Sequence, residues 1–457
     1  MRNGDISFWY TDCGLPLRRP PLDGDTEADV CIIGAGYTGL WAAWYLKQQA
    51  PDLNIVMLDR EFAGFGASGR NGGWLTGGFA WNHQRYLVDS NRAAVQAMIA
   101  AMAETVDEVI AVAEACGIDA DIVRTDELLV ATNRAQLARL QAFQASRESW
   151  QVTADRTHLI DAGALKARLA VAGAQGAMVI GGVARVQPAK LVTGLAAAVA
   201  AKGVRIAEGT TVVRYGAGLV ETDRGRVRAP VILRATEGFT AGLPGHGREW
   251  LAMNSAQIVT EPLPDRLWDQ IGWRGHELFG DYAHSYCYAQ RTREGRIAMG
   301  GRGVPYRYGS RTDQRGQTQD ETIRQLTAIL HRHFPMVRDV LIAHAWCGTL
   351  GVPRDWCATV GFDAATGLGF AGGYVGVGVS TSNLAGRTLA DLALGRSSER
   401  TALPWVNRKV RQWEGEPWRW LGVHGMYQLF NRADRQEAQG GPESRLAALA
   451  NRVMGRH

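Results

Sequence analysis

The sequence predicts an α/β protein, because two short apolar runs each end directly in a glycine-rich turn that opens a helix. One run lies near the N-terminus and the other ends at residue 371. Long helical patterns and groups of strands between them add an α+β part. A chain of 457 residues, 46% of them hydrophobic, is long enough for two or three domains with large cores.

The first unit begins with the apolar run ADVCII at 28–33 and continues into GAGYTG at 34–39 and an apolar helical pattern. In this order of strand, GxGxxG and helix, Gly34 makes the tight turn, Gly36 admits a pyrophosphate and Gly39 packs the helix against the strand. The N-terminus of the helix then faces the anion. We therefore expect a Rossmann-like dinucleotide-binding domain here.

A second strand, 54–58, ends in Asp59, where an acidic side chain is expected to accept a hydrogen bond from a ribose hydroxyl. A GxGxxG motif alone is a weak signal, and a glycine-rich turn without a ligand is the alternative. The strand, the helix and the acid at the end of the next strand together favour a bound dinucleotide.

The segment GFGASGRNGG at 64–73 adds five glycines together with Ser, Arg and Asn. Such a loop can offer several backbone N–H groups and a hydroxyl to one extended anionic cofactor. A flexible surface linker is the alternative, but the loop lies where a cofactor would leave the first phosphate turn.

These motifs, with LDR at 58–60, resemble the D-amino-acid oxidase, glycine oxidase and sarcosine oxidase family, and most of all its γ-glutamylputrescine oxidase-like branch. The resemblance covers roughly residues 5–430. It implies FAD as the cofactor, with Ser68 on the pyrophosphate and Gly72 and Gly73 beside the flavin. Trp74 departs from the glutamine expected in this family.

A third glycine-rich turn, GGYVGVG at 372–378, follows an apolar run and precedes an apolar helix at about 380–394. Its backbone N–H groups and the helix N-terminus can stabilise negative charge on a reduced flavin, which a nicotinamide enzyme does not need. The resemblance and the three turns together assign these residues to the cofactor: Gly34, Gly36, Tyr37, Thr38, Gly39, Asp59, Arg60, Gly66, Ala67, Ser68, Arg70, Asn71, Gly72, Gly73, Trp74, Val212, Val213, Cys347, Gly373, Tyr374, Gly376 and Gly378.

The family topology implies a discontinuous FAD-binding domain with a substrate-binding domain of a sheet plus helices. The expected parts are 1–88, 152–240 and 347–395 for FAD, 89–151 and 241–346 for the substrate, and 396–457 as a C-terminal extension packing on the FAD domain. His331 and His333 are two apart in a helical stretch and point to different faces, so we expect solvated side chains and no metal site.

Amine oxidation by a flavin needs a neutral amine held with its α-carbon near the flavin, and a strong base is not obligatory. Tyr286 and Tyr288 share one strand face and suit an aromatic cage for an amine, although half-buried strand tyrosines are the alternative. Arg302 can pair with a substrate carboxylate, or lie at the surface. Trp346 is a further candidate wall.

The resemblance leaves the electron acceptor and the flavin linkage open. In the sarcosine oxidase branch a strand lysine activates oxygen, but no lysine occurs from 203 to 408, and Arg296 stands at roughly that place. Because arginine or histidine can supply the positive charge, an oxidase is favoured over a dehydrogenase. Cys347 stands near the position of that branch's flavin-bonding cysteine, yet non-covalent FAD is favoured because the GASGRNGG branch usually binds it so.

The leading hypothesis is therefore an FAD-dependent enzyme that oxidises the C–N bond of a primary or secondary amine. A γ-glutamylated polyamine, an alkylamine or an amino acid would give an imine and then an aldehyde or ketone, while O2 becomes H2O2. One alternative is an amino-acid or N-methylamino-acid dehydrogenase that passes electrons to a quinone or carrier protein. Another is a non-catalytic, flavin-bearing subunit.

Composition narrows the partners. The net charge of +5 comes with no basic run, so nucleic acid is not an expected partner. Six cysteines without a CxxC pair indicate reduced thiols, and a charged N-terminus without an apolar region argues against a signal peptide. We expect a cytoplasmic monomer or homodimer without a membrane span.

Overall fold

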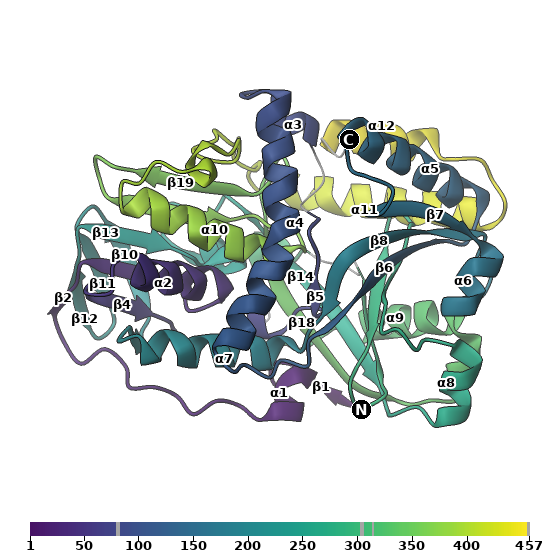
Figure 1. The fold of residues 1–457 in the computed structure, drawn as a ribbon, viewed down its shortest axis with the longest axis horizontal. Coiled ribbons are helices and arrows are strands. Elements are labelled where there is room, and N and C mark those ends of the chain that lie inside the picture. Colours follow the sequence, from purple (N-terminus) through teal and green to yellow (C-terminus); the bar gives the residue numbers. More distant parts are fainter. Residues whose placement is uncertain (79–82, 302–305, 313–314, 455–457) are drawn as a thin grey trace.

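The computed structural model describes residues 1–78, 83–301, 306–312 and 315–454. These residues form a six-stranded, a four-stranded and a ten-stranded sheet. In Figure 1 the two smaller sheets lie on the left, the large sheet on the right, and the long helix α4 (Arg92–Ala115) stands between them. The predicted α/β class is confirmed.

The six-stranded sheet has the order β19-β20-β13-β3-β4-β9 and is parallel except for β19. Helices α2, α7 and α10 cover one face, and the four-stranded sheet covers the other. Because both faces are covered, every residue of β3 and β4 is buried. The strands and helices are β3 (Val30–Ile33), β4 (Ile55–Leu58), β9 (Arg205–Ala207), β13 (Val231–Arg234), β19 (Thr359–Asp363), β20 (Leu368–Gly372), α2 (Tyr37–Gln49), α7 (Pro188–Ala201) and α10 (Gly378–Ala393). The four-stranded sheet comprises β2 (Thr26–Glu27), β10 (Val212–Gly216), β11 (Leu219–Thr222) and β12 (Gly225–Arg228).

The ten-stranded sheet has the order β1-β18-β14-β17-β16-β15-β6-β8-β5, with β7 paired to β8. One face packs on helices α6, α8 and α9 around a separate hydrophobic core. The strands are β1 (Arg2–Asn3), β5 (Trp74–Leu75), β6 (Val123–Ala131), β7 (Thr157–Asp161), β8 (Gly176–Arg185), β14 (Leu251–Thr260), β15 (Leu278–Asp281), β16 (Cys287–Arg291), β17 (Ile297–Gly301) and β18 (Ile342–Val352). The remaining helices are α1 (Phe8–Cys13), α3 (His83–Leu87), α5 (Arg134–Ser149), α6 (Ala162–Arg168), α8 (Asp265–Ile271) and α9 (Asp320–His333).

Strand pairing departs from the predicted domain boundaries. Strands β7 and β8 fall within 152–240, the expected FAD part, but β8 pairs with β6 in the large sheet and β7 pairs with β8 there. Most of β18 falls within 347–395 and pairs with β14 in the same sheet. The predicted boundaries missed this because consecutive segments alternate between the two sheets.

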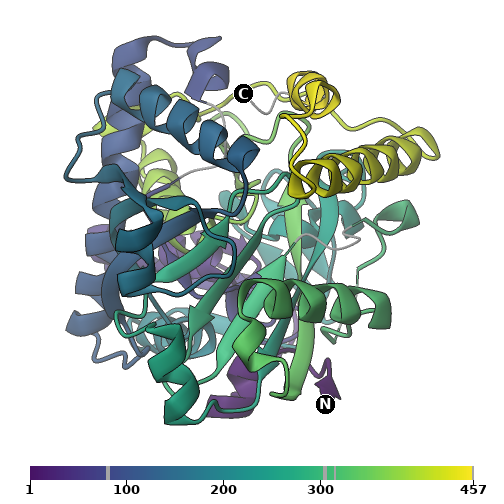
Figure 2. The ribbon, with the colours of Figure 1, turned by 90° about the vertical axis from the view of Figure 1, so that its right-hand side faces the viewer.

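The C-terminal extension also departs from the prediction. Trp405 packs in the core of the six-stranded sheet, as expected for this segment. Helices α11 (Trp418–Ala438) and α12 (Arg445–Met454), however, lie on the side of the large sheet (Figures 1 and 2), where Glu437 of α11 pairs with Arg139 of α5 at 3.0 Å. The extension therefore contacts both sides of the molecule.

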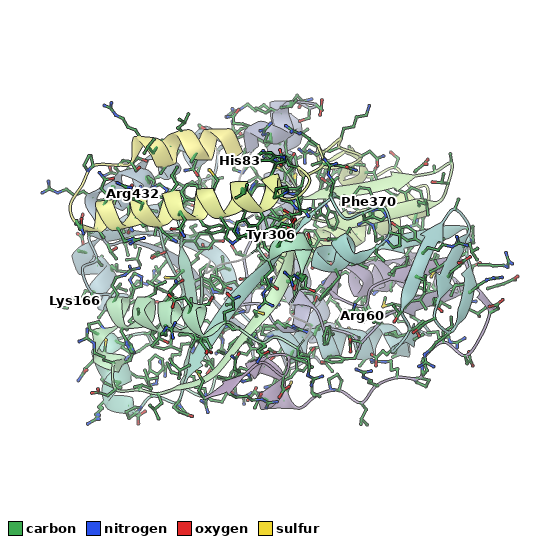
Figure 3. All side chains as sticks on the ribbon, turned by 180° about the vertical axis from the view of Figure 1, so that it is seen from behind. Arg60, His83, Lys166, Tyr306, Phe370 and Arg432 are labelled. Atoms are coloured by element: carbon green, nitrogen blue, oxygen red, sulfur yellow. The ribbon has the colours of Figure 1, made fainter. Side chains whose placement is uncertain are left out.

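Among the described residues, no helix combines the length and the apolar character needed to cross a bilayer. None of the six cysteines takes part in a disulfide. Lys166, one of only five lysines in the chain, lies at the outer edge of the molecule (Figure 3).

Candidate active site

A cavity of about 1250 Å³ lies between the carboxyl ends of β3, β4 and β13 and the uncovered face of the large sheet. Pockets for one small molecule usually measure about 300–1,000 Å³. The cavity therefore has room for a large ligand and a second molecule beside it. Helices α4 and α5 contribute to the wall at the large-sheet end.

The first glycine turn reaches the cavity at the start of α2. Gly34 has a φ of +104°, and a Cβ there would lie 2.6 Å from the Ala235 carbonyl oxygen, so only glycine fits. A Cβ on Gly39 would lie 2.1 Å from the Gly34 oxygen, so this residue lets α2 pack close to β3, as predicted. A Cβ on Gly36 would point at the Ser68 hydroxyl, 3.0 Å away, and would narrow the space beside the turn.

The Asp59 side chain stands at the end of β4, as predicted, but its carboxylate also supports the backbone. It accepts hydrogen bonds from the N–H groups of Ala35, at 2.9 Å, and Glu61, at 2.8 Å. Burial raises the pKa of Asp59 to about 6. Each Asp59 oxygen keeps a second lone pair, so the carboxylate can still accept a hydrogen bond from a ribose hydroxyl.

The second glycine-rich loop is shaped by its own polar side chains. The buried Arg70 donates from Nε to the Phe65 carbonyl at 2.7 Å and from Nη1 to the Cys347 carbonyl at 3.3 Å. Asn71 donates to the Ser68 carbonyl at 2.8 Å and accepts from the Gly73 N–H at 2.8 Å. Arg70 is thus a buried cation on the cavity wall.

The third glycine turn is held by Glu237, which the sequence reading missed. Its carboxylate accepts the backbone N–H groups of Gly373, at 2.9 Å, and Tyr374, at 3.1 Å, and also that of Gly351. Burial raises the pKa of Glu237 to about 7. Glu237 follows β13, the parallel neighbour of β3, and an acid at such a strand end was the available signal.

All three turns line the same cavity. Of the residues predicted for the cofactor, the lining includes Gly34, Gly36, Tyr37, Thr38, Asp59, Arg60, Gly66, Ala67, Ser68, Arg70, Asn71, Gly72, Trp74, Val212, Tyr374, Gly376 and Gly378. The turns are joined directly, because the Tyr37 N–H donates to the Ser68 hydroxyl at 2.9 Å and the Thr38 and Tyr374 hydroxyls lie 2.8 Å apart.

Five predicted cofactor residues do not line the cavity: Gly39, Gly73, Val213, Cys347 and Gly373. Val213 is 52% exposed, and it lies where the register of β10 against β11 shifts between Val212 and Arg214. The Cys347 thiol donates to the Gln317 carbonyl at 3.4 Å and packs in the core beneath the large sheet. Strand alternation therefore turns this thiol away from the cavity.

Of the predicted catalytic residues, Tyr286 and Tyr288 line the cavity. Tyr288 lies on β16, its hydroxyl is 3.3 Å from the Ser255 hydroxyl, and its ring meets that of Trp74 edge-on with centroids 5.9 Å apart. Tyr286 precedes the strand, on the segment 282–286. Arg302 lies outside the described residues.

Arg296 and Trp346 are not part of the cavity wall. Arg296 precedes β17 and donates to the Thr260 carbonyl at 2.9 Å and to Glu261 at 3.1 Å. Trp346 is fully buried and donates to the Arg70 carbonyl at 2.9 Å, so it supports the second loop from behind. Their predicted roles as cavity residues are wrong, because each side chain is used in packing elsewhere.

Helix α11 fixes the cavity segment 282–286, another feature that sequence reading missed. The Asp434 carboxylate accepts the N–H groups of His284, at 2.8 Å, and Ser285, at 2.9 Å. The buried Glu437 lies 3.0 Å from the His284 ring nitrogen and 3.0 Å from Arg139, which also lines the cavity.

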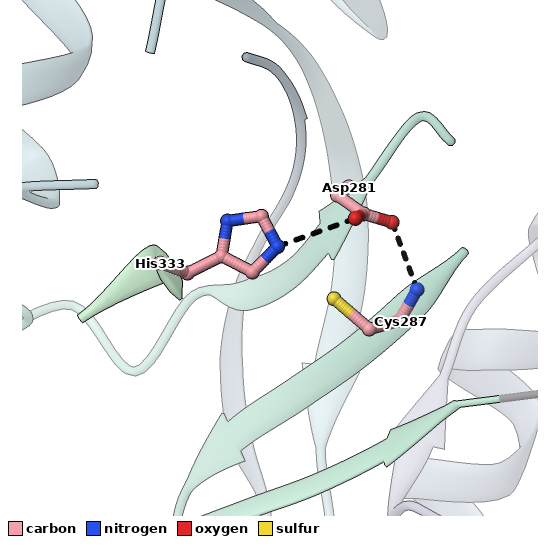
Figure 4. Close-up of side chains that lie close together, drawn as sticks. All are labelled: Asp281, Cys287 and His333. Carbon is pink, nitrogen blue, oxygen red and sulfur yellow. Dashed lines mark hydrogen bonds and ion pairs between the residues drawn. The ribbon is translucent and has the colours of Figure 1, made fainter. Parts of the chain in front are cut away.

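The base of the same segment is held by the buried residues Asp281, Cys287 and His333 (Figure 4). Asp281 lies 3.2 Å from the His333 ring and accepts the Cys287 N–H at 2.8 Å. The possible ligand atoms of the three lie within 4.8 Å of one another. The prediction of a solvated His333 is wrong, because the last turn of α9 faces β15 and the ring has a carboxylate partner there.

The large-sheet end of the cavity carries two ionisable side chains, Glu127 and Arg147. Glu127 lies on β6 and accepts the Thr76 hydroxyl at 3.2 Å, and burial raises its pKa to about 7. Arg147 comes from α5 and donates to the Thr157 hydroxyl at 3.0 Å, and burial lowers its pKa.

Residues 29–392 match the sequence profile of the family described as DAO, FAD dependent oxidoreductase. The chain belongs to this family. A DAO-family chain requires a site for FAD, and the three glycine turns around one cavity fit that requirement. The absence of a side chain at Gly36 keeps the space beside the first turn open, whereas a Cβ there would lie 3.0 Å from the Ser68 hydroxyl.

Two relatives resemble this DAO-family chain over most of their length. A probable oxidoreductase OrdL of Rhizobium meliloti (strain 1021) is 30% identical over 410 residues, covering 86% of this chain and 89% of that protein. The gamma-glutamylputrescine oxidoreductase of Escherichia coli (strain K12) is 28% identical over 384 residues, covering 82% and 85%.

Solved structures share the fold. Glycine oxidase from Geobacillus kaustophilus superposes with a TM-score of 0.67 at 20% identity, covering 81% of this chain and 96% of that one. L-Amino acid deaminase from Proteus myxofaciens superposes with a TM-score of 0.68 at 13% identity, covering 89% and 97%.

Proposed function

We propose that this FAD-dependent oxidoreductase oxidises the C–N bond of a primary or secondary amine to an imine, which water converts to an aldehyde or ketone. The observation that carries the proposal is the form of the cavity, in which three glycine turns meet the uncovered face of the large sheet. The resemblance to a gamma-glutamylputrescine oxidoreductase supports an amine, such as a γ-glutamylated polyamine, as the substrate class.

In this proposal the two ends of the cavity have different tasks. The glycine turns and Ser68 bind FAD without a covalent bond, and FAD supplies the two-electron acceptor. Tyr286 and Tyr288 line the substrate end, where ring faces attract an ammonium group and exclude water. The division into an FAD part and a substrate part follows the sheets, with β7, β8 and β18 on the substrate side.

We propose O2 as the electron acceptor and H2O2 as the second product. Arg70 is buried on the cavity wall, and we propose that its positive charge favours the reduction of O2. It would take the part of the strand lysine of the sarcosine oxidase branch, which this chain lacks. A dehydrogenase that uses a quinone is the second candidate, because Arg296 is bound to Thr260 and Glu261 and does not reach the cavity.

The test is steady-state turnover of the purified holoenzyme with γ-glutamylputrescine, putrescine, glycine and L-proline. We expect one of these amines to consume O2 and release an equal amount of H2O2. Turnover with an artificial quinone but without peroxide would assign the dehydrogenase instead. No turnover with either acceptor would contradict amine oxidation of this class.

A further inference from the structure

Six described carboxylates line the cavity, and they differ in how far their oxygens are already used. The six are Asp59, Glu61, Glu104, Glu127, Glu237 and Asp281. Asp59 and Glu237 accept backbone N–H groups, and Asp281 is bound to His333 and the Cys287 N–H. These three therefore hold loops in place.

Glu127 is different because it is buried and sparsely bonded. Its side chain belongs to a residue only 9% exposed, and among the described residues the Thr76 hydroxyl is its one hydrogen-bond donor. Glu61 and Glu104, by contrast, are partly or fully exposed, and Glu61 pairs with Arg18 at 2.9 Å. A buried carboxylate with spare acceptor capacity is costly unless a ligand or a proton completes it.

The surroundings place Glu127 beside the region that we assign to the flavin. Thr76 follows the second glycine loop by only a few residues, and its carbonyl accepts the Ser380 hydroxyl at 2.6 Å, in the first turn of α10. Helix α10 begins at the end of the third glycine turn. Glu127 is therefore tied to the point where two cofactor loops meet the large sheet.

Two charged or titratable side chains face Glu127, and neither forms an ion pair or hydrogen bond with its carboxylate among the described residues. Arg147 faces it from α5, but among the described residues no ion pair within 4.0 Å joins the two, and the Arg147 guanidinium donates to the Thr157 hydroxyl instead. Tyr282 faces it from the segment after β15, and burial raises the pKa of this hydroxyl, which keeps it neutral. Burial raises the pKa of Glu127, while the Thr76 hydrogen bond and the Arg147 charge lower it.

We propose that Glu127 binds the ammonium group of the substrate and accepts one proton from it. The proton moves from the substrate nitrogen to a Glu127 oxygen, so an ammonium and a carboxylate become a neutral amine and a carboxylic acid, and no other bond changes. This inference rests on the proposed function, because it names the group that prepares the amine for oxidation. A carboxyl that titrates near neutral pH is suited to this exchange.

The test compares Glu127→Gln with a matched control, Asp126→Asn, in the FAD-loaded protein. Asp126 directly precedes Glu127 on β6, does not line the cavity and pairs with Arg168 at 2.7 Å. We expect E127Q to keep its FAD and visible spectrum but to lose at least about 100-fold in kcat/KM for γ-glutamylputrescine, the loss expected for a general base. D126N is expected to match the wild type.

A second readout does not depend on turnover. In infrared difference spectra of the wild type, carboxylic C=O bands of Glu127 and Glu237 are expected to titrate near pH 7, and the Glu127 component is expected to be missing from E127Q while the Glu237 component remains. The kcat/KM of the wild type should rise with pH through the same region, because only the carboxylate accepts a proton. This acidic limb should disappear in E127Q.

The outcomes separate the two claims. If the wild type oxidises the amine and E127Q does so equally well with the same acidic limb, the Glu127 role is wrong and the proposed function stands. If no amine reduces the wild-type flavin, the proposed function fails and the Glu127 role with it. Should E127Q fail to fold, Glu127→Asp decides, because a shifted acidic limb supports the role and an unchanged limb overturns it.

Discussion

The backbone N–H of Tyr37 donates a hydrogen bond of 2.9 Å to the Ser68 hydroxyl, and this bond joins the first two glycine loops. The N–H lies in the first turn of α2, where unpaired N–H groups and the helix dipole attract an anion. Ser68 therefore stands at the place where a pyrophosphate would be bound.

The space beside Gly36 predicts that Gly36→Ala weakens FAD binding. A Cβ there would meet only the Ser68 hydroxyl, at 3.0 Å, so the fold should survive while the path of the phosphates is narrowed. We expect the purified variant to carry less than half of the wild-type FAD, measured from its visible absorbance. Gly216→Ala is the control, because a Cβ at this half-buried strand position meets nothing within 4 Å, and its FAD content should not change.

The Glu237 carboxylate predicts a stability effect that is separate from cofactor contacts. Glu237→Gln replaces one acceptor oxygen with an NH2 group, so the side chain can no longer accept the N–H groups of Gly373 and Tyr374 on one side and that of Gly351 on the other. We expect the free energy of unfolding to fall by roughly 1–3 kcal/mol in denaturant titrations. Glu399→Gln, at an exposed position, should leave it unchanged. Equal stability of both variants would contradict this role of Glu237.

The bonds from Asp434 predict that α11 sets the affinity for the substrate. Asp434→Ala leaves two N–H groups of the cavity segment without their acceptor, so His284 and Tyr286 lose their fixed positions. We expect the KM for the amine to rise several-fold while FAD content stays the same. Arg432→Ala, on the exposed side of the same helix (Figure 3), should keep the wild-type KM. An unchanged KM in D434A would show that α11 does not position this segment.

The orientation of Cys347 predicts that the flavin is not bonded to the protein. Its thiol faces the Gln317 carbonyl and the core beneath the large sheet. After acid precipitation, we expect all of the yellow colour in the supernatant, both for the wild type and for Cys347→Ser. Colour retained in the wild-type pellet but not in the C347S pellet would overturn the expectation.

The glycine turns could be predicted from the sequence because each is a local feature, with strand, turn and helix adjacent in the chain. The contacts of Glu237 and Asp434 could not, since each joins segments more than 100 residues apart. Arg296 and Trp346 were misplaced for a related reason. Only the pairing of β14, β17 and β18 decides which side chains of those strands face the cavity.

The partner of His333 could not be predicted from the sequence either. Helical periodicity separates it correctly from His331, yet only the packing of α9 on the large sheet brings it to Asp281. Likewise, nothing local marks Glu127 as different from Asp126, although one lines the cavity and the other pairs with Arg168.

The measurement that tests the account most directly is an anaerobic titration of the purified yellow protein with γ-glutamylputrescine, putrescine, glycine and L-proline in turn. We predict that at least one of these amines bleaches the flavin absorbance with about one equivalent per FAD. A flavin that dithionite bleaches fully but that keeps its oxidised spectrum with every amine would contradict the account.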